Sequence, residues 1–172
     1  MSKAFISVGS NIEPEQNIAA ALSKIKVLSD IIAISTFYKS SAIGNNDMPD
    51  FYNGMISIET QIEEHGLKFV IMRGIEDSLG RKRTENKYSS RTIDLDVIIY
   101  DDKIIDEPDY KLPDPDLFTR PFLAYPLAEL EPNLILPGTA MTAIELASKL
   151  DKSGLISLVD YTKKIKSLIK IN

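Results

Sequence analysis

Two aspartates, Asp94 and Asp96, interrupt an otherwise apolar run over residues 93–99. Side chains of a strand alternate between its faces, so both carboxylates should share one face, roughly 6 to 7 Å apart. At that separation they repel each other by about 2 to 3 kcal/mol for an effective dielectric near 20. Paired carboxylates suit Mg²⁺, which takes one or two of them together with substrate phosphates. The alternative is a strand with one solvated face, on which both are ordinary surface residues.

The segment just before these aspartates, residues 81–91, is basic in a chain whose net charge is −5. Its cations are Arg81, Lys82, Arg83, Lys87 and Arg91. A solvated charged loop would explain such a run. However, arginine binds phosphate in bidentate fashion, so Arg81, Arg83 and Arg91 suit a polyphosphate held opposite a carboxylate-bound Mg²⁺, as phosphoryl transfer requires. The sequence lacks the Walker A, GxGxxG and HRD signatures, which indicates another kind of nucleotide site.

Composition excludes several other classes of site. The chain has no cysteine and only one histidine, so disulfides, thiolate sites and multi-histidine metal sites are excluded. The net negative charge argues against broad binding to nucleic acid or to anionic membranes. We find no apolar run of the length of a signal peptide or a membrane span, and we therefore expect a cytoplasmic protein.

The elements that must position these residues follow from hydrophobic periodicity. We predict strands over residues 4–8, 31–38, 54–60 and 92–100, with a short strand at 103–105. One helix carries Ile18, Leu22, Ile25 and Leu28, and another carries Leu67, Ile71, Ile75 and Leu79 and stops at Gly80. The order βαββαβ is that of a ferredoxin-like antiparallel sheet with two helices on one face.

The remaining segments should cover the other face of this α+β fold. Residues 115–130 and the amphipathic helix at 141–150 are the candidates. With 172 residues and 44% hydrophobic content, we expect one domain over 1–172, with a core of about 3–150 and a C-terminal extension at 151–172. A helix at 161–169 should dock through Ile165, Leu168 and Ile169, although its basic face leaves a membrane-surface role as the alternative.

Three segments carry a resemblance to a known family. They are GSN after the first strand, FYKSSAIGNNDMPDFYN in the second loop, and RTIDLDVIIY behind the basic segment. In order and spacing, residues 5–137 resemble the 6-hydroxymethyl-7,8-dihydropterin pyrophosphokinases of folate biosynthesis. The resemblance implies transfer of pyrophosphate from ATP to the pterin hydroxymethyl group with release of AMP. It also implies two Mg²⁺ ions bound by Asp94 and Asp96.

The same resemblance implies roles for individual residues. It places Arg81, Arg83 and Arg91 on the ATP phosphates, with Glu76 and Arg120 close to the nucleotide, and it gives Arg81, Arg91, Asp94 and Asp96 to catalysis. The implied pterin site consists of Phe51 and Phe122 as a stacking pair, Asn53 as the reader of the pterin edge, and Ser40, Ser41, Ile43 and Asp94 around them.

Two departures from the family pattern lie on the nucleotide side. Asp114 stands in the ATP site where the family commonly has a histidine, and Ser89 and Ser90 precede Arg91 in place of smaller residues or proline. We expect retuned nucleotide binding rather than loss of activity.

Two alternatives follow, a divergent member that binds pterin or nucleotide with weak or altered activity, and a ferredoxin-like nucleic-acid-binding module. An RNP-type strand pattern is missing, and Asp94 and Asp96 would repel nucleic-acid phosphates. We therefore expect ATP and the pterin as partners of a monomer, with neither nucleic acid nor membrane.

Overall fold

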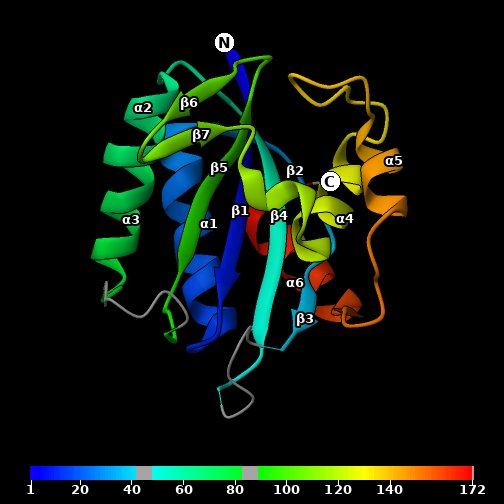
Figure 1. The fold of residues 1–172 in the computed structure, drawn as a ribbon. Coiled ribbons are helices and arrows are strands. Elements are labelled where there is room, and N and C mark those ends of the chain that lie inside the picture. The colour runs from blue at the N-terminus through cyan, green and yellow to red at the C-terminus, as the bar shows by residue number, and fades with distance from the viewer. Residues whose placement is uncertain (42–47, 83–88, 172) are drawn as a thin grey trace.

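The structure, a computed structural model, describes residues 1–41, 48–82 and 89–171. In these ranges the main sheet has the order β5-β1-β4-β3-β8, with β2 also paired to β4, and every pairing is antiparallel. Its strands are β1 (Ser2–Ser10), β2 (Asp30–Ile34), β3 (Tyr38–Ser40), β4 (Phe51–Thr60), β5 (Asp94–Tyr100) and β8 (Ile156–Ser157). A separate hairpin joins β6 (Ile105–Glu107) to β7 (Tyr110–Leu112). Figure 1 shows helices on both sides of the sheet, which confirms a mixed α+β fold with an antiparallel sheet.

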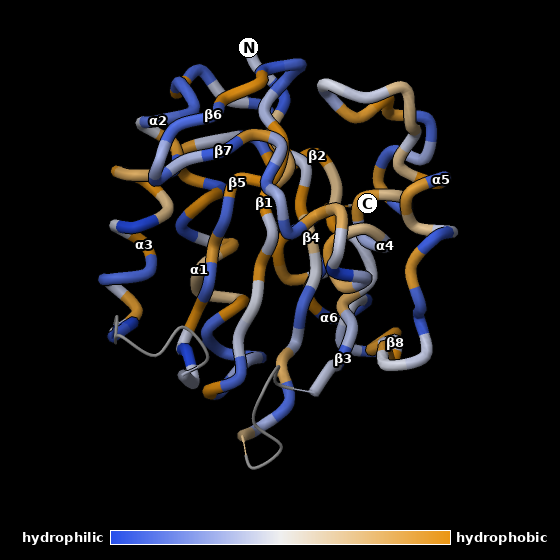
Figure 2. Tube along the Cα trace, in the orientation of Figure 1, coloured by the Kyte–Doolittle hydropathy of each residue, from blue (hydrophilic) through white to orange (hydrophobic). Residues whose placement is uncertain are grey.

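One face of the sheet is covered by five helical segments. These are α1 (Pro14–Leu28), α2 (Glu64–Gly66), the π-helix η1 (Leu67–Met72), α3 (Arg73–Ser78) and α6 (Val159–Ile169). The core beneath them collects alternate residues of β1, namely Ala4, Ile6 and Val8. Figure 2 shows apolar stretches along the strands of the main sheet.

The other face carries a second core, as we predicted for residues 115–130 and 141–150. The 3₁₀ helix η2 (Pro115–Phe118), α4 (Pro121–Leu130) and α5 (Ala143–Ser148) pack there against Phe5, Met55 and Ile99. Helix α5 begins with a capping box in which the side chains of Thr142 and Glu145 each accept the backbone N–H of the other. The acidic pair and α4 therefore share one face, since β1 pairs Gly9 with Asp94 and Phe5 with Ile99.

The predicted continuous strand over residues 31–38 is wrong, because it is broken between β2 and β3. At the break, the N–H of Phe37 donates to Thr162 Oγ1 at 2.9 Å, and its carbonyl accepts the N–H of Leu158 at 2.8 Å. The backbone of Phe37 thus bonds to the C-terminal segment, while its ring is fully buried against Gly54 and Tyr161.

The predicted helix with Leu67, Ile75 and Gly80 is confirmed, but its middle is π-helical. Leu67 and Met72, five residues apart, are both buried, whereas the expected Ile71 is only partly so. A π-helical turn holds one residue more than an α-helical turn, which shifts the buried stripe from Ile71 to Met72.

The C-terminal helix is confirmed as α6, but its predicted contacts are only partly right. Tyr161, Ile165 and Ile169 are buried in the same core as α1, and they form a stripe with four-residue spacing. Leu168, by contrast, is 59% exposed because it falls outside that stripe. No helix in the described ranges is long and apolar enough to cross a membrane.

The contact between Gly54 and Phe37 gives a stability prediction. A Cβ at Gly54 would lie 2.8 Å from two ring carbons of the buried Phe37. We expect Gly54→Ala to lower the free energy of unfolding by about 1 to 3 kcal/mol through overpacking. Chemical denaturation monitored by circular dichroism measures this.

The matched control is Gly74→Ala in α3, where the added Cβ meets nothing within 4 Å. Alanine favours helix over glycine, so this variant should be as stable as the parent or up to about 1 kcal/mol more stable. Equal stabilities of the two variants would contradict the proposed role of the Gly54–Phe37 contact.

Candidate functional site

The site lies where β1 ends and β5 begins, and a glycine opens it. In the sheet register, Gly9 of β1 stands opposite Asp94 of β5 on one side and Asn53 of β4 on the other. A Cβ on Gly9 would lie 2.7 Å from Asn53 Oδ1 and 3.8 Å from the Cβ of Asp94. Only glycine therefore leaves room for the Asn53 amide beside Asp94.

Asp94 is neutralised by two of the predicted arginines. Nη1 of Arg81 donates to Asp94 Oδ1 at 2.6 Å, and Nη1 of Arg91 donates to Asp94 Oδ2. All three side chains are mostly buried. Both carboxylate oxygens of Asp94 therefore accept a hydrogen bond from an arginine that the sequence predicted for phosphate.

Glu76 lies beneath this group and fixes Arg81. Its side chain is almost completely buried, and Oε1 accepts both the N–H of Leu95, at 2.9 Å, and Nη1 of Arg81. Burial by itself lowers the pKa of Arg81, but the carboxylates of Asp94 and Glu76 outweigh it and raise that pKa above its usual value. Arg81 is therefore a permanent, oriented cation of the site.

Asp96 has a different environment. Among the residues that the structure describes, the cation paired with it is Lys68 of η1, with 3.8 Å between Lys68 Nζ and Asp96 Oδ1. Although 43% of the Asp96 side chain is exposed, surrounding protein atoms reduce its hydration, and this burial together with the charge of Asp94 raises the pKa of Asp96 to about 7. Lys68 could not be found by sequence reasoning, because the pattern around it shows only the apolar stripe of a helix.

Asn11 holds Arg91 from behind. Its Oδ1 accepts the N–H of Arg91 at 2.8 Å, and its own N–H donates to the carbonyl of Arg91 at 3.2 Å. Its Nδ2 donates to the carbonyl of Pro49 and to Ser90 Oγ. Asn11 thus ties together three segments of the site. The sequence marked it only as part of the GSN motif, and the Ser90 departure proves to be one of its partners.

The predicted pterin residues are only partly brought together. Asn53 Nδ2 donates to Ser40 Oγ at 2.9 Å, and Phe51 is the register partner of Ser40. Phe122, at the start of α4, packs against the second core, and within the described chain no ring-to-ring contact joins it to Phe51. Ser41 is exposed after β3. Ile43 of the pterin site and Arg83 of the ATP site lie outside the described residues.

Asp114 has a structural task. Its Oδ1 accepts the N–H of Asp116 at 2.9 Å and caps η2, while its N–H donates to the carbonyl of Ile98. Burial raises the pKa of Asp114, which lies close enough to Asp96 for the two charges to interact. Arg120 is half-buried at the start of α4, and in the described part of the chain it forms no ion pair.

The carboxylate pair is the available metal donor set. Over residues 1–41, 48–82 and 89–171, no group of three or more His, Cys, Asp or Glu side chains is arranged to hold a metal ion. Asp94 and Asp96 offer two hard oxygen ligands on one face. This fits a Mg²⁺ ion that takes its remaining ligands from water and phosphate.

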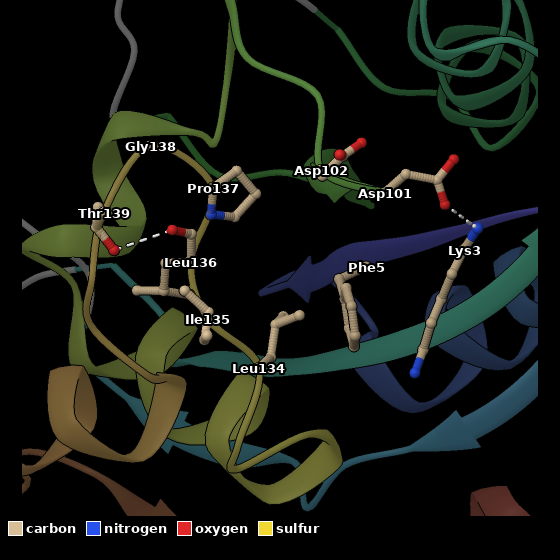
Figure 3. A pocket seen from close by; sticks show the side chains of 10 residues that line it. All are labelled: Lys3, Phe5, Asp101, Asp102, Leu134, Ile135, Leu136, Pro137, Gly138 and Thr139. Atoms are coloured by element: carbon tan, nitrogen blue, oxygen red, sulfur yellow. Dashed lines mark hydrogen bonds between the residues drawn. The ribbon is translucent and has the colours of Figure 1, made fainter.

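A cavity of about 470 Å³ lies far from this pair, at the other end of β5. Figure 3 shows Lys3, Asp101 and Asp102 on one side of it and the segment from Leu134 to Thr139 on the other. Asp101 follows Asp94 by seven positions, or about 23 Å of extended strand. The cavity is therefore separate from the site.

Comparison with known proteins gives consistent matches. A sequence model of the family described as 7,8-dihydro-6-hydroxymethylpterin-pyrophosphokinase (HPPK) matches residues 5–132. The chain is 34% identical over 161 residues to the 2-amino-4-hydroxy-6-hydroxymethyldihydropteridine pyrophosphokinase of Haemophilus influenzae, covering 92% of this chain and 99% of that protein. The protein of the same name from Aquifex aeolicus is 34% identical over 138 residues, or 80% of this chain and 85% of its own length.

A solved structure shares the fold. The crystal structure of wild-type Plasmodium falciparum HPPK-DHPS with pteroate matches with a TM-score of 0.71 at 13% identity, over 99% of this chain. The present chain spans 44% of that longer one.

The buried position of Glu76 gives a second prediction. Glu76→Ala leaves the N–H of Leu95 without its acceptor and removes one partner of Arg81. We expect a loss of about 3 to 5 kcal/mol in the free energy of unfolding, since breaking a buried pair strands the remaining charge. Urea denaturation measures it.

Glu15→Ala serves as the comparison, because Glu15 pairs with Lys164 on the surface at 2.9 Å. Glu15→Ala should lower the free energy of unfolding by less than about 1 kcal/mol. If Glu76→Ala lowered it by no more than this surface change, the buried network would not stabilise the site.

Proposed function

The chain belongs to the HPPK family, and we propose that the group around Asp94 and Asp96 is the site of its reaction. The protein is an ATP-dependent pyrophosphokinase that transfers pyrophosphate from ATP to 6-hydroxymethyl-7,8-dihydropterin in folate biosynthesis. The observation that carries the proposed site is the Asp94 carboxylate held between Arg81 and Arg91, with a second carboxylate two residues away.

The reaction needs phosphates to be oriented and their charge to be offset. The hydroxymethyl oxygen of the pterin bonds to the β-phosphorus of ATP, the bond from that phosphorus to the α,β-bridging oxygen breaks, and AMP leaves. When bound by Asp94 and Asp96, Mg²⁺ neutralises phosphate charge and polarises the β-phosphorus. Arg81 and Arg91 bind the phosphate oxygens and hold them in line with the entering hydroxyl.

This role requires the arginines to exchange partners. Both now occupy oxygens of Asp94, the same oxygens that a metal ion would take. If Asp94 held Mg²⁺, Arg81 and Arg91 would leave its carboxylate oxygens and donate to the phosphate oxygens of ATP instead. Glu76 keeps Arg81 in place during the exchange, because its contact lies on the buried side.

The local charge balance supports two Mg²⁺ ions. With Asp96 ionised, as a bound metal ion would keep it, the ion pairs of the site join three carboxylates (Glu76, Asp94 and Asp96) to three cations (Lys68, Arg81 and Arg91). ATP adds about four negative charges, which two divalent cations offset. A single ion would leave an excess of negative charge in a partly buried site.

The pterin enters beside Asn53. The amide of Asn53 is fixed by Ser40 and by the space above Gly9, so it can read the polar edge of a flat heterocycle. Phe51 and Phe122 provide its two stacking faces in this proposal. Ser41, Ile43 and Asp94 complete the pterin side, and Arg83, Asp114 and Arg120 the nucleotide side.

Several finer points stay predictions from the sequence. They are the monomeric state, the cytoplasmic location, the single domain over 1–172, the ferredoxin-like assignment of the sheet and the absence of nucleic-acid partners. The sheet order β5-β1-β4-β3 supports the ferredoxin-like assignment, because it places the first and third predicted strands at the centre. Family membership favours the pyrophosphokinase over the nucleic-acid-binding alternative.

The metal-binding role of Asp96 predicts a large loss of activity. Asp96→Ala should lower the rate of AMP formation from ATP, Mg²⁺ and 6-hydroxymethyl-7,8-dihydropterin by about 10²-fold or more, as for removal of a transition-state contact. Asp102→Ala, an exposed aspartate beyond the far end of β5, should keep wild-type activity. Wild-type activity in Asp96→Ala would refute the proposed site. A parent protein that binds both substrates without forming AMP would favour the divergent alternative.

The pterin-binding role of Asn53 predicts a selective effect. Asn53→Ala should raise the KM for the pterin by roughly tenfold, the loss expected for one or two hydrogen bonds, and should leave the KM for ATP within about twofold. The exposed Asn133→Ala is the control. An equal rise in both KM values would show that Asn53 only stabilises the sheet.

A further inference from the structure

Lys68 is a mostly buried cation that faces the acidic pair from η1. Only 17% of its side chain is exposed. The ammonium lies 4.7 Å from the ring centre of Tyr110 and 6.0 Å from that of Phe69. Cation–π contacts with these aromatic rings fix the direction of the side chain.

The ammonium of Lys68 lacks a direct acceptor in the described part of the chain. Its nearest carboxylate oxygen, Asp96 Oδ1, is 3.8 Å away, beyond hydrogen-bond distance. An ammonium carries three N–H donors, and the 17% of the side chain that is exposed leaves them open to solvent or to a ligand. The protein therefore holds a cation beside Asp96 with its donors available to a ligand oxygen.

A metal ion at Asp96 sharpens this requirement. Mg²⁺ bound by Asp96 would take over the attraction that the carboxylate exerts on Lys68, and two cations would then face each other at short range. Their repulsion is relieved when an anionic oxygen lies between them. A phosphate oxygen of ATP fits this position.

The backbone conformation independently supports a binding role for Lys68. Lys68 is the second residue of the π-helix Leu67–Met72, and π-helical turns occur frequently at functional sites. The extra residue rotates Lys68 by about 100° relative to Glu76 and Ile75, compared with an unbroken α-helix. From this turn the Lys68 ammonium lies 3.8 Å from Asp96 Oδ1.

We infer that Lys68 is a further substrate-binding residue, which binds a phosphate oxygen of ATP on the Asp96 side of the pair as Arg81 and Arg91 do on the Asp94 side. The inference rests on the proposed function, since it takes Mg²⁺ and ATP as the ligands of Asp94 and Asp96.

The test is a calorimetric titration with Mg²⁺ and the α,β-methylene analogue of ATP, in which the bond to be broken is replaced. Lys68→Met keeps the aliphatic stem against Tyr110 and removes the charge, and it should weaken binding of the analogue at least tenfold. Lys68→Arg should remain within about threefold of the parent protein, and Lys68→Gln replaces Lys68→Met if the latter does not fold.

Lys103→Met is the matched control. Like Lys68, Lys103 lies near a carboxylate and a tyrosine ring: its Nζ is 2.6 Å from Glu64 Oε2 and 5.4 Å from the centre of the Tyr100 ring. It follows the end of β5 that is opposite to Asp94. Its removal should change binding of the analogue by less than twofold.

The outcomes separate the two claims. The inference is overturned if Lys68→Met binds the analogue within twofold of the parent. It is also overturned if Lys68→Met and Lys68→Arg bind the analogue equally weakly and lose the same thermal stability, because Lys68 would then contribute packing alone. If the parent binds the analogue but forms no AMP from ATP and pterin, the proposed function fails while the titration still decides the role of Lys68. If the parent does not bind the analogue, both fail.

Discussion

The site depends on one electrostatic constraint, the presence of several carboxylates in a small, partly buried volume. Asp94, Asp96 and Glu76 repel one another, and together they pair with three cations that come from three different parts of the chain. The loop after α3 provides Arg81, the segment before β5 provides Arg91, and η1 provides Lys68. The ion pairs therefore determine where these side chains lie, and the fold brings the three segments together.

That constraint also explains why so many contacts around the pair are made by the backbone. Asn11 binds the backbone of Arg91 on both its N–H and its carbonyl group, and Glu76 binds the N–H of Leu95 next to Asp94. With the backbone fixed in this way, the guanidinium groups could change partners without moving the main chain. This suits the proposed function, in which Arg81 and Arg91 exchange Asp94 for phosphate.

The sequence was sufficient for the parts of the fold that depend on local pattern. The acidic pair, the basic segment and the two helical faces all follow from periodicity and charge, and Glu76 and Asn53 followed from the family resemblance. Other features depend on residues far apart. At the break, the N–H of Phe37 donates to Thr162, which is 125 residues away in the sequence. Lys68 lies in a π-helical turn, which the apolar stripe of the helix does not reveal. Leu168 was wrongly predicted to be a docking residue, because the buried stripe of α6 passes through Ile165 and Ile169 instead.

The bonds between Phe37 and the C-terminal segment have a consequence for the order in which the protein is made. Strand β3 lies between β4 and β8, and its preceding residue bonds to Leu158 and Thr162. On the ribosome, Phe37 and β3 emerge long before these partners are synthesised. The nascent chain must therefore hold Phe37 without its backbone partners and without the Tyr161 ring until its last helix appears. Completion of the sheet around β3 is in this sense a late event of folding, although β3 lies in the first third of the chain.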